Sequence, residues 1–337
     1  NGDDPPRWNR TLSKTFDVAR AQFEPVTAEI GLVARYLDAE VKELYQGGTH
    51  VPSVRMGSWL SALEEQLVAW RVDDVRNLAT REGRERPPVH EVIQLNSTAR
   101  RDFLVDGARF MRNLEKPWKV VLRLEPDWTG LDVTVWTLDA RAADAEALLQ
   151  TTWARSKALN FLKGEAFSLG GEFLPPTAET WADLFLPEKV HRALTRIADL
   201  LAAKGAAMAN RGVVMAGPPG NGKTLSCRIL RNEAPGTTFI WVSARDFFRA
   251  GTYGAFTQAF DLGKECAPAV LCFEDVDAWI DREAVDLLKT EMDGVGRSTG
   301  VVTIVTTNFP ERLPEALIDR PGRFHDVLLF DHPTAAT

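Results

Sequence analysis

The chain has 337 residues, of which 45% are hydrophobic and 26% charged, as in soluble globular proteins with two or three domains. Its formal net charge of −7 argues against a protein that coats nucleic acid, although it leaves room for a local basic groove. Three cysteines without paired spacing, no apolar run of membrane-spanning length and no signal-peptide pattern lead us to expect a cytoplasmic protein.

The first part of the chain, 1–115, is predicted to be a mostly helical N-terminal region. Apolar residues recur there at helical spacing. Helices are expected at 11–46, 57–82 and 97–114. Trp59 and Trp70 fall on the apolar face of the second of these helices, so we interpret the tryptophans of this region as packing residues and not as platforms for bases.

A small α/β module is predicted at 116–165. The segments KVVLRLEP (119–126) and LDVTVWTL (131–138) alternate apolar and polar residues as strands do, with a turn between them. A helical stretch follows at 141–163. The Gly- and Pro-rich residues 166–180 are expected to form a linker.

From residue 181 onward, helical and strand patterns alternate. The strand candidates are 212–216, 237–243, 269–274 and 301–306. The last two are nearly continuous apolar runs, as expected for strands that are buried on both faces. We therefore predict that 181–337 folds as a three-layer αβα domain around a parallel sheet, which makes the fold class α/β.

The stretch VVMAGPPGNGKTL (213–225) predicts a nucleotide-binding site. It contains the phosphate-binding loop pattern Gly-x-x-x-x-Gly-Lys-Thr between a predicted strand and a predicted helix. Lys223 is expected to reach the terminal phosphates and Thr224 to ligate Mg²⁺, while backbone N–H groups cradle the phosphates. The predicted nucleotide-binding residues are Gly217, Pro218, Pro219, Gly220, Asn221, Gly222, Lys223, Thr224 and Leu225.

A second signal is AVLCFEDVDAW (269–279), an apolar run that ends in Glu274 and Asp275. A strand that delivers acids beside a phosphate-binding loop is what Mg·ATP chemistry requires. One carboxylate is expected to hold the metal through water and the other to orient or deprotonate the attacking water. Taken alone, the same run would be interpreted as a strand that ends in solvent-exposed acids.

Two further segments complete the pattern. In VVTIVTTNFPERL (301–313), Asn308 follows a predicted strand, where its amide could position the attacking water. In ALIDRPGRF (316–324), an arginine presented to a neighbouring subunit's nucleotide would neutralise charge in the transition state. A surface ion pair is the alternative for these arginines, and it suits Arg320 better than Arg323.

In this order and at these distances, GPPGNGKT, the Glu-Asp strand, LLKTEMDGV, TTN and ALIDRPGRF resemble the AAA branch of the AAA+ ATPases over about 178–331. The resemblance implies Mg²⁺-dependent ATP hydrolysis by a ring, usually a hexamer, with active sites shared between subunits. It makes Thr224 and Glu274 the Mg²⁺ ligands, Glu274 through water. The other implied catalytic residues are Asp275, Asn308 and Arg323. TWADLFLPEKV resembles the family's adenine-wrapping segment, which implies contacts from Asp183, Leu184 and Phe185.

The chain also departs from the family pattern. Most AAA proteins place Asp before Glu in the acidic pair, and the reversed order here resembles the mitochondrial AAA translocase of a folded iron–sulfur protein and its bacterial relatives. The position of a frequent second arginine is Asp326. Phe247 or Phe248 could form a pore loop with Arg249, and Phe248 is the better candidate; the alternative is that both phenylalanines pack under the sheet. The family's helical lid would begin at FDHPTAAT, so we expect no lid in the chain.

These patterns favour a ring-forming ATPase that remodels or translocates a protein, with nucleic acid as a less favoured substrate. The alternative is an ATP-binding switch or scaffold with negligible hydrolysis. A sequence-specific nucleic-acid enzyme is not supported, because 1–175 contains no helix-turn-helix, zinc-ligand or nuclease pattern. The expected partners are copies of the same chain and a protein whose identity the sequence does not indicate.

Overall fold

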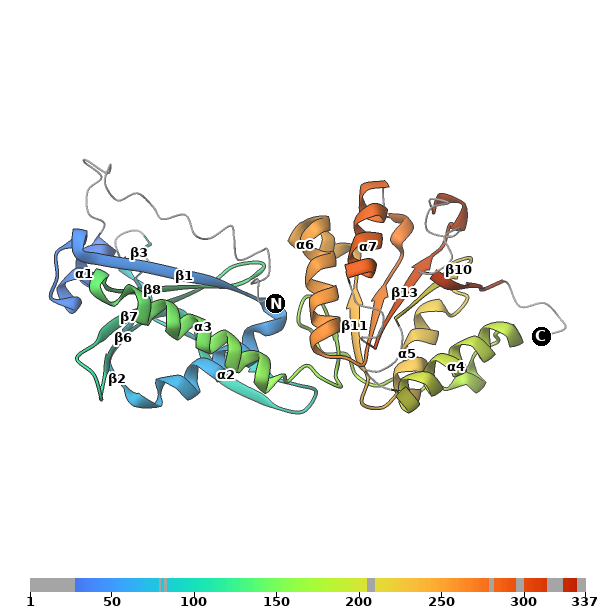
Figure 1. Ribbon diagram of the computed structural model, residues 1–337, viewed down its shortest axis with the longest axis horizontal. Coiled ribbons are helices and arrows are strands. Elements are labelled where there is room, and N and C mark those ends of the chain that lie inside the picture. Colours follow the sequence, from blue (N-terminus) through green and yellow to red (C-terminus); the bar gives the residue numbers. More distant parts are fainter. Residues whose placement is uncertain are drawn as a thin grey trace. The chain divides into compact units, whose positions relative to one another are not determined.

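The structure is a computed structural model. It describes residues 28–78, 80–81, 84–204, 210–278, 282–294, 300–313 and 324–331. The predictions for Arg320, Arg323 and the Arg249 side chain fall outside these described residues. The described chain divides into two compact units (Figure 1). The first comprises 28–93 and 102–158, and the second comprises 94–101 and 159–331.

The first unit is built on a six-stranded sheet with the order β1-β8-β7-β6-β2, in which β5 also pairs with β6. Its strands are β1 (Leu44–Pro52), β2 (Trp70–Arg76), β5 (Val89–Gln94), β6 (Arg100–Asn113), β7 (Lys119–Pro126) and β8 (Gly130–Leu138). The neighbours along the main path are antiparallel. Two short strands, β3 (Thr80–Arg81) and β4 (Arg84–Glu85), form a separate ribbon.

Helices cover both faces of this sheet. On one face, α1 (Ala28–Leu37) packs Val33 and Leu37 against a cluster that includes Val121. Val120 and Leu122 point the opposite way along β7 and are also fully buried. Figure 1 shows α2 (Met56–Gln66) and α3 (Ala142–Leu159) lying side by side across the sheet.

Several predictions for this half of the chain were wrong. The helix expected at 97–114 is largely the long strand β6, and within the stretches 11–46 and 57–82 the described residues 28–46 and 57–78 each run from a helix into a strand. A long strand buried on both faces loses strict alternation, so its apolar spacing resembles that of a helix. The strands expected at 119–126 and 131–138 are confirmed, but they belong to the same sheet as the preceding strands and not to a separate module.

The second unit contains a six-stranded sheet with the order β14-β10-β13-β12-β11-β9. All its neighbouring strands are parallel, as predicted. Its strands are β9 (Ala166–Ser168), β10 (Arg211–Ala216), β11 (Thr238–Val242), β12 (Ala269–Phe273), β13 (Val301–Thr307) and β14 (Phe324–Leu329). The presence of β9 shows that the predicted linker at 166–180 begins as an edge strand of this sheet.

Two pairs of helices sandwich the parallel sheet (Figure 1). The helices are α4 (Glu188–Lys204), α5 (Lys223–Glu233), α6 (Ala244–Glu265) and α7 (Arg282–Gly294). On one face, α4 and α5 bury a shared cluster with the strands, including Leu194, Leu230 and Met215. On the other, the Phe256 ring of α6 lies 5.2 Å from the Phe273 ring of β12. The predicted three-layer αβα architecture is therefore confirmed.

Candidate nucleotide-binding site

The segment between β10 and α5 forms the predicted loop. Its backbone needs glycine at Gly217, which has a φ of 151°, because a Cβ atom there would collide with the backbone oxygen of Phe330. Gly222, at the start of α5, has a φ of 88°, and a Cβ there would lie 2.8 Å from Leu184 Cδ2. The loop therefore fits closely against two other segments of the same unit.

Two hydrogen bonds anchor this loop to the sheet. The Gly217 N–H donates to the Thr307 carbonyl oxygen at 3.2 Å, and Asn221 Nδ2 donates to the Phe330 carbonyl oxygen at 3.0 Å. Thr307 ends β13 and Phe330 follows β14. The loop is thus held by the strands on both sides of β10, and Asn221 has a structural role within it.

Lys223 is almost fully buried, with 6% of its surface exposed. Its Nζ donates to the Gly217 oxygen at 2.5 Å, to the Pro218 oxygen at 2.9 Å and to Asn308 Oδ1 at 2.9 Å. Burial lowers the pKa of Lys223, and the nearby carboxylates of Asp275 and Asp277 oppose that effect. The ammonium group thus lies inside the loop, where a phosphate would meet it.

The acidic pair follows β12 directly, as predicted. Burial raises the pKa of Glu274, and hydrogen bonds with the side chains of Thr224 and Trp241 counteract this rise. Thr224 is exposed in the first turn of α5, and its hydrogen bond with Glu274 brings a hydroxyl and a carboxylate together beside the loop. Hydroxyl and carboxylate oxygens are the hard ligands that Mg²⁺ prefers, so these residues fit the predicted metal.

Asp275 has an unusual backbone. Its φ of 47° lies in the left-handed region, which a residue other than glycine occupies at a cost of about 1 kcal/mol or more. The Asp275 N–H donates to Thr306 Oγ1 at 3.0 Å, which helps to hold this conformation. The Asp275 carboxylate is exposed and accepts a hydrogen bond from Asn308 Nδ2 at 3.0 Å.

Three residues of this site were not predicted from the sequence: Asp277, Thr306 and Thr307. Asp277 Oδ1 accepts hydrogen bonds from Thr307 Oγ1 at 2.7 Å and from the Asn308 backbone N–H at 2.8 Å. The available signal was the order of polar residues, since Asp277 lies two positions after the acidic pair and the threonines directly precede Asn308.

The segment expected to contact adenine lies beside the loop through Leu184, which touches Gly222. Phe185 is 73% exposed. The Asp183 carboxylate accepts hydrogen bonds from the Thr180 N–H at 2.8 Å and from Thr180 Oγ1 at 2.9 Å, so it closes its own turn. Of the three residues, Leu184 thus has the contact with the loop, and Phe185 has a free ring face.

The two candidate pore phenylalanines differ sharply. The Phe247 ring packs 5.1 Å from the Phe256 ring and is 7% exposed, whereas Phe248 is 84% exposed. Asp326 occupies the position at which many AAA proteins have a second arginine. Its carboxylate forms an ion pair with Arg211 at 2.7 Å, which joins β14 to β10.

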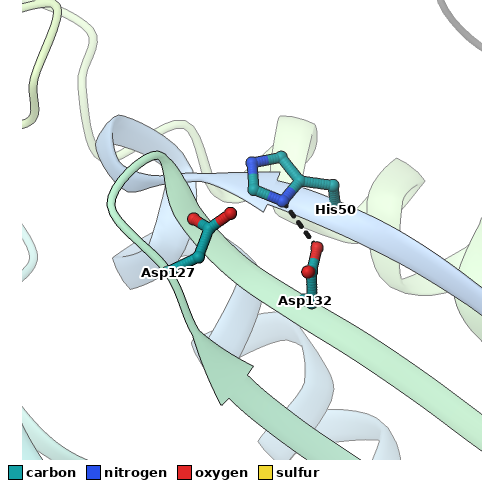
Figure 2. Close-up of side chains that lie close together, drawn as sticks. All are labelled: His50, Asp127 and Asp132. Carbon is teal, nitrogen blue, oxygen red and sulfur yellow. Dashed lines mark hydrogen bonds and ion pairs between the residues drawn. The ribbon is translucent and has the colours of Figure 1, made fainter. Parts of the chain in front are cut away.

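One other group of metal-ligating residue types occurs in the described part of the chain: His50, Asp127 and Asp132 (Figure 2). His50 Nδ1 lies 2.8 Å from Asp132 Oδ1, and its Nε2 lies 3.1 Å from Thr129 Oγ1. Asp127 accepts hydrogen bonds from Thr129 and from the Gly130 N–H. These bonds join β1 to the turn between β7 and β8, and they account for the cluster without a metal.

The nucleotide site joins three neighbouring strands of the parallel sheet. A glycine loop with a buried lysine follows β10, a carboxylate pair follows β12, and Asn308 follows β13 between them. This arrangement defines a P-loop nucleoside triphosphatase domain. Residues 213–332 match the profile of the "ATPase family associated with various cellular activities (AAA)", so this part of the chain is an AAA-family domain.

Two relatives are 31% identical to the chain over the residues that align with it. The "ATP-dependent zinc metalloprotease FtsH 1" of Symbiobacterium thermophilum is 31% identical over 238 residues, which cover 64% of this chain and 37% of that protein. The "ATP-dependent zinc metalloprotease FtsH" of Chloroflexus aggregans is 31% identical over 240 residues, covering 64% and 36%. The chain therefore spans less than two fifths of these relatives' length.

The crystal structure of the FIGL-1 AAA domain aligns with a TM-score of 0.38 and 23% identity, covering 46% of this chain and 55% of that chain. A similarity of this size adds nothing to the family assignment. The resemblance of the Glu-Asp order to the iron–sulfur-protein translocase is not confirmed by these relatives. No described helix has the length and apolar character needed to cross a bilayer.

Proposed function

We propose that the second unit binds ATP with Mg²⁺ and hydrolyses it. The observation that carries this proposal is the buried Lys223 ammonium group within the glycine loop, which Asn308 joins to Asp275 of the acidic pair after β12. Thr224 and Glu274 would supply two oxygen ligands of the kind that Mg²⁺ takes beside this loop. When bound, Mg²⁺ would neutralise charge on the phosphates.

The other residues then have distinct roles in the proposed reaction. Lys223 would exchange its bonds to the loop carbonyls for bonds to phosphate. Asp275, which is exposed, would orient or deprotonate the attacking water, and Asn308 would position that water. Because an Asp side chain is one methylene shorter than Glu, Asp275 has to approach the water more closely than the Glu of most relatives does.

We further propose that the chain works in a ring, with Arg323 completing the neighbouring subunit's site, and that hydrolysis drives the remodelling of a protein. The match of 213–332 to the AAA family supports this proposal, as does the similarity to ATP-dependent zinc metalloproteases. Phe248 is exposed and remains the candidate for gripping a substrate, together with Arg249, while the first unit would present that substrate.

A switch or scaffold that binds ATP and hardly hydrolyses it is the second candidate. The observation that favours it is the order of the acidic pair, because the partly buried residue is the longer Glu274 and the exposed residue is the shorter Asp275. Displacing a catalytic base from its optimal position can greatly lower the rate of hydrolysis. Nucleotide binding would then be retained without turnover.

Phosphate release and binding of a fluorescent ATP analogue by the full chain separate the two candidates. Steady release that is lost in Lys223→Ala and retained in Lys157→Ala, which alters an exposed lysine of α3, supports hydrolysis. Binding without release supports the switch. Undiminished release in Arg323→Ala at subunit concentrations that form rings would refute the shared site.

A further inference from the structure

Asp277 has no role in the reaction proposed above, yet it forms a hydrogen bond with Asn308, whose side chain contacts both Lys223 and Asp275. Its Oδ1 accepts a hydrogen bond from the Asn308 N–H at 2.8 Å and another from Thr307 Oγ1 at 2.7 Å. We propose that Asp277 is a positioning residue for ATP hydrolysis, which acts by fixing the Asn308 backbone. This inference rests on the proposed ATPase function.

The position of Asn308 explains why its backbone needs such a partner. Asn308 is the first residue after β13, beyond the paired residues of that strand. Its N–H bonds to the carboxylate of Asp277 and not to a neighbouring strand. Hydrogen bonds to an ionised group are shorter and stronger than those between neutral groups, so this bond holds the Asn308 backbone firmly.

The side chain of Asn308 makes use of this fixed backbone. Its Oδ1 lies 2.9 Å from Lys223 Nζ and its Nδ2 lies 3.0 Å from Asp275 Oδ1. The Asn308 amide accepts a hydrogen bond from Lys223 and donates one to Asp275, and it can keep both bonds only if the Asn308 backbone stays in place. Releasing the backbone from Asp277 would therefore disturb the proposed base and the phosphate-binding lysine without touching either.

Asp277 also lies in the short helical turn Val276–Ala278, so a purely structural role in that turn is the alternative. The two roles predict different behaviour of conservative variants. In Asp277→Asn, the side-chain oxygen can still accept the bond from Asn308. In Asp277→Glu, the charge is kept, but the carboxylate is displaced by one methylene. If Asp277 positions Asn308, turnover depends on where the acceptor oxygen lies. If Asp277 only stabilises its own turn, the effect of substituting it does not depend on Asn308.

The test measures kcat, nucleotide affinity and the thermal midpoint of the full chain. We expect Asp277→Ala to lower kcat about 10- to 100-fold, as removal of outer-shell partners does, with less than about a threefold change in affinity for a fluorescent ATP analogue. Asp277→Asn should restore kcat to within about threefold of the parent. Asp277→Glu should remain several-fold slower at a normal thermal midpoint, which keeps the test open if Asp277→Ala does not fold.

Non-additivity is the sharper criterion. If Asp277 acts through Asn308, the double variant Asp277→Ala/Asn308→Ala should be no slower than the worse single variant by more than about twofold. Losses that multiply would overturn the inference. So would a parent-like kcat in Asp277→Ala or Asp277→Glu, or an affinity loss as large as the loss in kcat.

Hydrogen–deuterium exchange of the nucleotide-free chain tests the same bond without turnover. The Asn308 amide should exchange faster in Asp277→Ala than in the parent, and at an intermediate rate in Asp277→Asn, which keeps the acceptor oxygen without its charge. Equal exchange in all three would contradict the inference. If the parent shows no Lys223-dependent phosphate release, the proposed function fails, and this exchange measurement still decides whether Asp277 holds Asn308.

Discussion

Lys223 Nζ lies 2.9 Å from Asn308 Oδ1, which joins the phosphate-binding loop directly to the end of β13. The same Asn308 side chain donates to the carboxylate of Asp275. The strand order β10-β13-β12 makes this possible, because the carboxyl ends of adjacent parallel strands meet at one edge of the sheet. A phosphate that binds Lys223 would compete with Asn308 for the ammonium group and so affect the residue next to the proposed base.

Asp275→Asn should separate binding from hydrolysis. The amide cannot accept a proton, so we expect turnover to fall by about 100-fold or more, as it does when a general base is removed. Asn tolerates the left-handed backbone of this position, so the fold and the affinity for ATP should be kept. Phosphate release and analogue binding check the prediction, and turnover equal to the parent's would contradict the role given to Asp275.

Glu274→Gln and Thr224→Val should change the response to Mg²⁺. Thr224→Val removes one of the two oxygen ligands beside the loop, and Glu274→Gln removes the negative charge of the other, so about tenfold or more Mg²⁺ should be needed for half-maximal nucleotide binding. The measurement is a Mg²⁺ titration of binding of a fluorescent ATP analogue. Glu311→Gln alters an exposed carboxylate after β13 and serves as the control. If all three variants respond to Mg²⁺ as the parent does, the metal is held elsewhere.

Phe247 and Phe248 should respond oppositely to truncation. Phe247→Ala removes a buried ring that packs against Phe256 and Phe273, so it should destabilise the second unit by about 3 kcal/mol or more. Phe248→Ala removes an exposed ring and should leave the thermal midpoint unchanged while impairing work on a protein substrate. Denaturant unfolding checks the first prediction. A large loss of stability in Phe248→Ala would exclude the substrate-gripping role as the explanation of any functional loss.

The second unit could be predicted from the sequence because its strands and its motifs support each other. Continuous apolar runs such as 301–306 indicate strands buried on both faces, and polar residues at their ends mark one edge of a sheet. The contacts of Asp277 could not be predicted in this way. An acid two positions after the acidic pair is equally compatible with a solvent-exposed turn, and only the folded chain shows that it reaches Asn308.

The first unit could not be predicted as well. In β6, the buried residues Phe103, Leu104 and Val105 are consecutive, and Ala108 and Met111 continue at spacings that suit a helix. The spacing of apolar residues therefore predicted a helix, whereas this segment forms a strand because it pairs with β7 and β2. In contrast, Asp127 and Gly130 mark the turn after β7 through residue types that favour turns in any context.

That turn provides a prediction about pH. Partial burial raises the pKa of Asp127, but hydrogen bonds from Thr129 and the Gly130 N–H lower it more, so the folded pKa lies below the ordinary value. A depressed carboxyl pKa stabilises the fold above the unfolded pKa of about 3.9, and this stabilisation is lost as pH falls through the folded value. The first unit should therefore lose stability below about pH 4, in part through Asp127.

Asp127→Asn removes this titration but keeps an oxygen that can accept the turn's hydrogen bonds. Between pH 6 and pH 3, its thermal midpoint should consequently fall less than that of the parent, by about 2–4 °C if the difference is near 1 kcal/mol. Asp139→Asn, at an exposed carboxylate after β8, should follow the parent. If Asp127→Asn also follows the parent through this range, the turn does not contribute to acid sensitivity.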